Sequence, residues 1–237
     1  MGFGVLAVAL GAYLLARETP LFAIDRIEVR GGPQPVAQQV QRALAAFVGT
    51  SLVGLDGSAL LRKVQALPTV SGASYDRNFP HTLEITVVPE RSASVLRRGP
   101  DSWLVSAHGR VIEHLSSSSI PRLPRIWIST HTPVETGADL TGSGPSTAAR
   151  AIGLSGAFAA HVASATYTNG ALVFRLHSGL EVLLGEAGDV KLKSAVAERV
   201  LPRLPQGSTF LDVSMPGRPV TGTGSPAIGS VKSSSRG

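Results

Sequence analysis

Side chains that could bind a metal or transfer a proton are few in this chain and widely spaced. The chain has no cysteine, which excludes a thiolate nucleophile, a thiolate metal site and a disulfide. Its six histidines are His81, His108, His114, His131, His161 and His177. Two of them, His108 and His114, are six residues apart, which is not the spacing of two zinc ligands on one helix face. We therefore expect the histidines at turns and on the surface, and no metal site.

Two short motifs resemble catalytic or phosphate-binding sequences, but each lacks a necessary feature. GLSGA, at residues 153–157, lacks the spacer residue of a Gly-x-Ser-x-Gly nucleophile elbow. TGSGPS, at residues 141–146, lacks the lysine of a phosphate-binding loop. Asp56 and Asp189 lie at the starts of expected helices and are interpreted as helix caps, with Ser58 as an alternative to Asp56. Asp212 is interpreted as a turn or strand-end residue. The sequence therefore predicts no catalysis and no cofactor.

Composition and charge favour a folded protein that does not bind nucleic acid. Of the 237 residues, 43% are hydrophobic and 16% are charged, which is enough apolar surface for one large domain or two small ones. The net charge of +6 would suit a nucleic-acid-binding domain, but the basic residues occur singly or in pairs such as Arg97-Arg98. A dispersed positive surface favours solubility, and it would suit a protein that lies beside anionic lipid or wall polymer.

The first residues contain an uncharged apolar run, residues 3–16. As a helix this run would rise about 21 Å, whereas the hydrocarbon core of a membrane is about 30 Å thick. A signal peptide would need a basic start and a better cleavage site than ARETP, and a buried globular helix would show a polar face. We therefore expect residues 1–18 to be part of a transmembrane helix whose upstream end is missing, with the membrane exit at residues 17–20.

Residues 19–90 are predicted to form a small domain with the order β-α-α-β-β. Period-two alternation predicts strands within 24–32, 70–77 and 83–88. Two helices are expected between the first two strands, over residues 35–49 and 55–68. The economical packing is a three-stranded sheet with both helices on one face, which leaves an exposed sheet edge where another chain could add a strand.

Residues 91–222 are predicted to form a second, mainly β domain with flanking helices, so that the fold class is α+β. Hairpin turns are expected at His108-Gly109, at Asn169-Gly170 and at residues 177–179. Two helices are expected, near 147–162 and near 189–204, and the second should carry an apolar stripe at Leu192, Val196 and Val200. The stretch 130–146, before the first of these helices, is expected to be a loop. The predicted strands are residues 93–98, 102–115 as a hairpin, 123–129, 165–186 as two or three strands, and 209–222 as the last strand, with a break at Pro216-Gly217. Residues 223–237, rich in Gly and Ser, are expected to be disordered.

The ordered motifs of the first domain resemble the POTRA domain of the FtsQ/DivIB family of bacterial cell-division proteins. The resemblance lies in FAIDRIEVRGG, residues 22–32, and in TSLVGLDGSALLRKVQALPTVSGASYDRNFPHTLEITVVPER, residues 50–91. In that family, Pro-Glu-Arg marks the passage from the POTRA domain to a second domain. Pro89, which has no N–H and so ends ladder pairing, suits such a junction.

The resemblance continues through the second domain. It lies in LVSAHGRVI at residues 104–112, LHSGLEVLLGEAGDVKLKSAVAERVL at 176–201 and FLDVSMPGRPVT at 210–221. The chain departs from the family pattern after Asp212, where Val-Ser replaces the usual Leu-Arg, and it lacks aromatic residues often found in the terminal strand.

The resemblance implies a non-catalytic scaffold anchored in the inner membrane by one helix, with most of the chain outside the cytoplasm at the division septum. The implied partners are the small coiled-coil division proteins FtsB (also DivIC) and FtsL, through which the scaffold is linked to septal peptidoglycan synthesis. The implied contact strand is residues 209–221. The implied partner-binding residues are Phe210, Val213 and Met215 through their side chains, Ser214, Gly217 and Arg218 through the backbone, and Arg199 and Arg203 through charge.

Two other functions remain open on the sequence. A POTRA-containing outer-membrane assembly or secretion protein would need many further alternating strands after residue 90, and about 130 residues with helices follow. An unrecognised extracytoplasmic enzyme would need a convergence of histidine, carboxylate and nucleophile that only a structure can show. For Phe210 a place in the core, and for Arg199 and Arg203 a solvated helix face, are the alternatives to partner contact.

Overall fold

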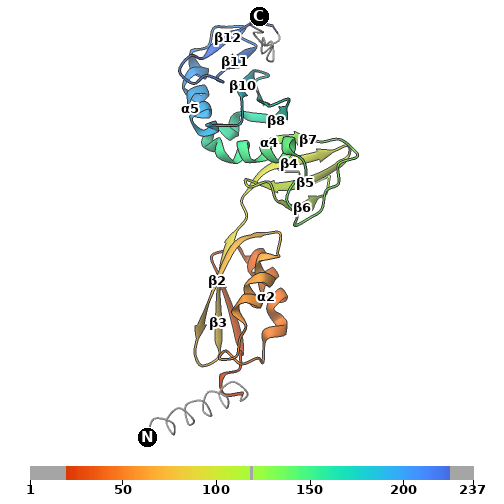
Figure 1. The fold of residues 1–237 in the computed structure, drawn as a ribbon, viewed down its shortest axis with the longest axis vertical. Coiled ribbons are helices and arrows are strands. Elements are labelled where there is room, and N and C mark those ends of the chain that lie inside the picture. The colour runs from red at the N-terminus through yellow and green to blue at the C-terminus, as the bar shows by residue number, and fades with distance from the viewer. Residues whose placement is uncertain (1–19, 118–119, 225–237) are drawn as a thin grey trace, which may run out of the picture. The chain divides into compact units, whose positions relative to one another are not determined.

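The computed structural model describes residues 20–117 and 120–224, which form two compact units (Figure 1). The first unit ends at Glu90 and the second begins at Arg91. Among the described residues, no helix is long and apolar enough to cross a membrane. The predicted transmembrane segment, residues 1–18, and nearly all of the predicted disordered tail, residues 225–237, lie outside the described residues.

The first unit has the predicted β-α-α-β-β order. Its elements are η1 (Pro20–Phe22), β1 (Arg26–Arg30), α2 (Gln34–Leu44), η2 (Ala45–Phe47), α3 (Gly57–Gln65), β2 (Val70–Asn78) and β3 (Thr82–Pro89). The strands form one sheet in the order β1-β3-β2, with β1 parallel and β2 antiparallel to β3. Both helices lie on one face of this sheet, as predicted, and share a buried core with it (Figure 1).

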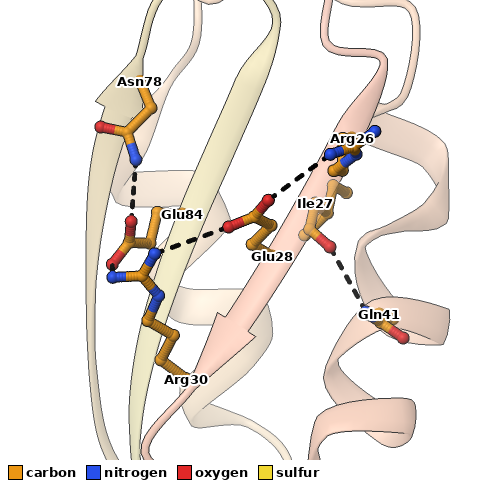
Figure 2. Close-up of polar contacts among 7 residues, drawn as sticks. All are labelled: Arg26, Ile27, Glu28, Arg30, Gln41, Asn78 and Glu84. Atoms are coloured by element: carbon orange, nitrogen blue, oxygen red, sulfur yellow. Dashed lines mark hydrogen bonds and ion pairs between the residues drawn. The ribbon is translucent and has the colours of Figure 1, made fainter.

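The open face of this sheet carries polar side chains in rows. In the parallel register Glu28 lies beside Glu84, which places two like charges side by side. Arg30 lies between them, with Nη1 2.9 Å from Glu84 and Nη2 3.6 Å from Glu28, and Asn78 donates to Glu84 at 2.8 Å (Figure 2). At the β1 end of the sheet, Gln41 of α2 donates to the carbonyl oxygen of Ile27. This contact covers part of the edge that the sequence predicted to be exposed.

The predicted cap of α3 is confirmed. The carboxylate of Asp56 accepts hydrogen bonds from the backbone N–H of Ser58 at 2.9 Å and of Ala59 at 3.0 Å, and from the Ser58 hydroxyl at 2.7 Å. These bonds satisfy backbone donors that the first turn of a helix leaves free. The hydrogen bond from the Ser58 side chain, followed by that from Ala59, lowers the pKa of Asp56 below its ordinary value.

A pH dependence follows from the lowered pKa. Because the folded pKa lies below the unfolded value of 3.8, the ionised Asp56 stabilises the fold above that value. This stabilisation is lost as the pH falls through the folded pKa. Asp56→Asn keeps a capping oxygen but cannot titrate, so we expect it to lose less stability than the parent chain between neutral and strongly acidic pH. Urea unfolding followed by circular dichroism measures the difference; equal losses would contradict the role given to Asp56.

The second unit is built on a nine-stranded sheet with the order β12-β11-β10-β9-β8-β7-β4-β5-β6. Its elements are β4 (Ser92–Arg98), β5 (Asp101–Ser106), β6 (Val111–Leu115), β7 (Arg125–Trp127), α4 (Ser143–Leu154), η3 (Gly156–His161), β8 (Val162–Thr168), β9 (Ala171–Leu176), β10 (Glu181–Gly185), α5 (Val190–Val200), η4 (Leu201–Arg203), β11 (Phe210–Asp212) and β12 (Val220–Gly222). Both units thus combine helices and sheets, as the α+β prediction requires.

One face of the nine-stranded sheet is buried beneath α4, η3 and α5. A single row of side chains crosses six neighbouring strands on that face and is almost completely buried: Leu96, Ile126, Ala165, Phe174, Val182 and Leu211. Small and apolar residues of α4 and α5 belong to the same core, among them Ala148, Ile152, Val190 and Ala197. The opposite face of β7 to β11 therefore carries the alternating residues, such as Trp127 and Asp212.

Three local predictions for the helices are wrong. Helix α4 begins at Ser143, inside the stretch expected to be a loop, because Gly142 has a φ of 89° and Pro145 lies in the first turn. Asp189 does not cap α5, since it has left-handed backbone geometry and its side chain makes no capping bond. In α5 the predicted apolar stripe began at Leu192, but that side chain is exposed and Lys193 is buried instead.

Candidate partner-binding edge

Strand β12 forms one end of the large sheet, and β6 forms the other. Strand β11 lies between β10, to which it is parallel, and β12, to which it is antiparallel. The predicted break at Pro216-Gly217 lies in the connection between these two strands. The predicted contact strand, residues 209–221, is wrong for β11, because β11 is paired on both sides and only β12 has an unpaired side. The seven connecting residues contain Pro216 and Pro219, which cannot donate to a ladder, and a turn in which Arg218 N–H donates to Met215 O.

Backbone hydrogen bonds show which groups of β12 face outward. Val213 N–H donates to Leu183 O and Glu181 N–H donates to Thr209 O, so the odd-numbered residues of this segment bond to β10. The exception is the N–H of Thr209, just before β11, which donates to Gly222 O of β12. Backbone groups alternate along a strand, so Phe210 and Asp212 bond to β12 through their register partners Gly222 and Val220. The N–H and C=O of Thr221 then point away from the sheet. Within the described residues, no strand pairs with that side of β12.

The predicted side-chain contacts lie in very different environments. Val213 is completely buried in the core of the second unit, whereas Met215 is 70% exposed. Phe210 is half-buried, and its ring lies so close to Gly222 that a β-carbon there would be 2.8 Å from Cε1. The ring of Phe210 therefore packs across β12 within its own sheet. The exposed apolar side chains of this segment are Met215 and Val220, and Val220 lies on β12 itself.

The predicted backbone contacts do not form a strand. Ser214, Gly217 and Arg218 belong to the connection between β11 and β12, and the N–H of Ser214 donates to the carboxylate of Asp212 at 2.8 Å. Gly217 and Arg218 are exposed beside Met215. The prediction that residues 214–218 supply strand pairing is wrong, because two prolines and the turn interrupt the regular alternation of backbone groups. The connection instead brings exposed groups next to the outward edge of β12.

The two predicted arginines precede β11 in the chain. Both Arg199, in α5, and Arg203, in η4, are exposed, and neither forms an ion pair with a described residue. Nη1 of Arg203 donates to the carbonyl oxygen of Arg199 at 2.7 Å and so satisfies an acceptor at the end of α5. Arg199 has no such structural role and remains available to an acidic group.

A buried lysine near the edge was not predicted as a site residue. Lys193 is only 6% exposed, and its ammonium group donates to the carbonyl oxygen of Glu186 at 2.7 Å. This bond ties α5 to the loop that begins at Glu186, directly after β10. At Gly185, the last residue of β10, a β-carbon would lie 2.8 Å from Cβ of Ser214. Lys193 thus supports the loop on which the β11–β12 connection rests. The i, i+3, i+7 spacing of Val190, Lys193 and Ala197 was the sequence signal for its burial.

Lys193→Met should destabilise the second unit by about 1–2 kcal/mol, because Glu186 O loses a charge-assisted partner that the thioether cannot replace. Lys191→Met, at an exposed position of the same helix, is the matched control and should change the stability by less than about 0.5 kcal/mol. Both tryptophans of the chain lie in the second unit, so their fluorescence in urea reports its unfolding. Equal effects of the two substitutions would contradict the anchoring role of Lys193.

The described residues do not bring a catalytic constellation together. A surface hollow of about 800 Å³ lies on the open face beside the edge, lined among others by Tyr167, Leu172, Leu183, Asp212 and Ser214. No histidine lines it. Within residues 20–117 and 120–224, no group of three or more histidine or carboxylate side chains could hold a metal ion.

Comparison with known proteins defines the class of the chain. Residues 22–90 match the family model described as POTRA domain, FtsQ-type, and residues 94–215 match the model described as cell division protein FtsQ/DivIB, C-terminal. The two units are thus a POTRA domain and an FtsQ/DivIB-type C-terminal domain. The chain belongs to the FtsQ/DivIB family of cell-division proteins, and the family predicted from the sequence motifs is confirmed.

Individual relatives agree with the family match over part of their length. The chain is 37% identical over 97 residues to cell division protein FtsQ of Mycolicibacterium smegmatis, an alignment that covers 41% of this chain and 28% of the relative. It is 28% identical over 103 residues to cell division protein FtsQ of Agrobacterium fabrum, covering 44% of this chain and 32% of the relative. The aligned part of the chain spans about a third of the length of these curated relatives.

Proposed function

We propose that this chain is a non-catalytic scaffold of the bacterial division machinery that captures a partner by adding a strand to β12. The partners would be FtsB/DivIC-like and FtsL-like division proteins, and the assembly would link them to septal peptidoglycan synthesis. The observation that carries the proposal is the unpaired outward edge of β12, in a chain of the FtsQ/DivIB family. An added strand would satisfy the outward N–H and C=O of Thr221, and main-chain hydrogen bonds would provide affinity.

The groups around the edge fit this mode of binding. Pro219 has no N–H, so regular pairing can begin only at the residues that follow it. Met215 would supply an apolar contact beside the added strand, and Gly217 and Arg218 leave the backbone accessible there. Arg199 would attract an acidic side chain of the partner. A short edge strand with a proline at its start also limits unwanted pairing with other chains.

The uncharged run at residues 3–16 supports a membrane anchor. We place the protein in the inner membrane at the division septum, crossing it once, with the two described units outside the cytoplasm. The match of residues 94–215 to the FtsQ/DivIB C-terminal model favours this function over outer-membrane assembly.

A backbone substitution tests the proposed edge directly. Thr221→Pro removes an outward N–H but none of the hydrogen bonds between β11 and β12 that involve Gly222 and Val220. It also removes the bond from the Thr221 hydroxyl to Phe210 O, so Thr221→Val, which loses that bond but keeps the N–H, is the matched control. We expect Thr221→Pro to weaken binding of the FtsB-like protein of the same organism by about tenfold or more relative to Thr221→Val.

Binding is measured by titration calorimetry with the full chain in nanodiscs, and hydrogen exchange at the Thr221 amide gives an independent reading. The amide should become protected when the partner binds. Equal affinities of the two variants, with an unprotected amide in the complex, would show that the partner binds elsewhere.

A further inference from the structure

Two large apolar side chains project from one end of the first unit. Leu21 is 68% exposed in η1, and Phe79 is 55% exposed in the turn between β2 and β3. Residues at the tip of a hairpin turn are usually polar, so an exposed phenylalanine there is unusual. The ring of Phe79 rests edge-on against Phe22, with centroids 5.6 Å apart and ring planes at 89°. The aromatic pair therefore holds Phe79 next to the residue that follows Leu21.

Hydrogen bonds fix the turn to the segment that carries Leu21. The N–H groups of Asp25 and Arg26 donate to His81 O at 2.9 and 3.3 Å, and Nδ1 of His81 lies 3.0 Å from Ala23 O. Figure 1 shows the β2–β3 turn at the same end of the unit as the start of the described chain. We call Leu21, Phe22 and Phe79 the apolar tip. The backbone hydrogen bonds from Asp25 and Arg26 to His81 hold the segments that carry these three side chains next to each other.

The sequence before the apolar tip indicates what covers it. Only residues 17–20 separate Leu21 from the uncharged run at 3–16. Five peptide steps extend the chain by at most about 18 Å, so Leu21 cannot be far from the end of that run. This step rests on the proposed membrane anchor: if the run lies in the bilayer, the apolar tip lies at the bilayer surface.

The charges around the apolar tip indicate how it would bind. Asp25 and Arg26, both exposed, carry opposite charges, so the neighbourhood offers no strong attraction to anionic headgroups. Apolar and aromatic side chains surrounded by polar groups insert at the level of the headgroups, and their binding scales with the apolar area buried. We propose that Leu21 and Phe79 insert into the bilayer interface and hold the first unit against the membrane. The partner is the lipid surface itself, and binding is largely independent of lipid charge.

The absence of cysteine allows a direct test in the full chain. A single cysteine at Asn78, next to the tip, is labelled with an environment-sensitive fluorophore, and the chain is placed in nanodiscs with nitroxide lipids quenching near the headgroup. Val88→Cys is the matched position, because Val88 is 57% exposed on strand β3, which begins just after the turn, but lies near the far end of that strand. We expect quenching at position 78 to exceed that at position 88 by about threefold, in zwitterionic and anionic lipids alike.

The double variant Leu21→Ser/Phe79→Ser, with the probe at position 78, tests insertion against mere proximity. Its quenching should fall to the level of position 88, whereas Val88→Ser should leave the signal at position 78 unchanged. Undiminished quenching in the double variant would overturn the proposal, because closeness to the membrane would then come from chain length alone. A loss of quenching in zwitterionic lipid only would also overturn it, since headgroup charge would then hold the unit.

A probe at Ala9→Cys distinguishes two outcomes: that the apolar tip does not insert, and that the proposed membrane anchor itself is wrong. If position 9 is quenched by lipids labelled in the acyl chain while position 78 is no more quenched than position 88, the anchor stands and the apolar tip does not insert. If none of the three positions is quenched, both the proposed anchor and the insertion of the tip are wrong.

Discussion

Replacing Val213 by aspartate is expected to leave the second unit close to unfolding. Val213 is completely buried and packs in the core beneath α4 and α5. The substitution removes apolar burial and places a carboxylate among the apolar side chains of this core. Together these effects should cost at least about 4 kcal/mol, a large part of the stability of a typical domain. Urea unfolding monitored by the fluorescence of Trp103 and Trp127 measures the loss.

Met215→Lys is the matched comparison, two residues further along the same segment. Met215 is 70% exposed, so this variant should keep the parent stability to within about 0.5 kcal/mol and weaken capture of the FtsB-like partner. The two variants test different roles that the sequence pattern did not distinguish. Val213 supports the edge from inside the core, whereas under the proposed function Met215 would face the partner. A stable, partner-binding Val213→Asp protein would contradict the burial of this residue, and undiminished capture by Met215→Lys would remove that side chain from the interface.

Gly153→Ala is expected to destabilise the second unit, against the usual effect of this change in a helix. Helix propensity alone would favour alanine by about 1 kcal/mol. However, a β-carbon at Gly153 would lie 2.6 Å from Cβ and 2.8 Å from the carbonyl oxygen of Ala107. Backbone atoms cannot move aside as a flexible side chain can, so α4 must shift away from the β5–β6 turn. We expect a net loss of about 2 kcal/mol from this overpacking.

The control for Gly153→Ala is Leu154→Ala, at the next position of α4, where the side chain is 48% exposed and little should change. Both variants are compared in urea by tryptophan fluorescence. A more stable Gly153→Ala protein would show that the contact with Ala107 relaxes without cost and that propensity decides the outcome.

Sequence patterns determined those parts of the molecule that depend on neighbours in the chain. Alternation along residues 26–30 and 82–88 predicted the strands of the first unit, because successive side chains of a strand face opposite sides. Asp56 was identified as a helix cap because the bond that it makes spans only two or three residues. Ordered motifs over most of the chain were sufficient to identify the family.

Tertiary structure alone decided which side chains and edges are available to another molecule. The pattern of residues 209–221 is that of a strand, but whether such a strand ends a sheet depends on pairing with segments distant in sequence, and β12 takes that place instead of β11. By helix propensity alone Gly153 would be a weak point of α4, but its close approach to Ala107 gives it a packing role. Local periodicity records the side toward which a residue points, whereas burial and free edges depend on what the rest of the chain places there.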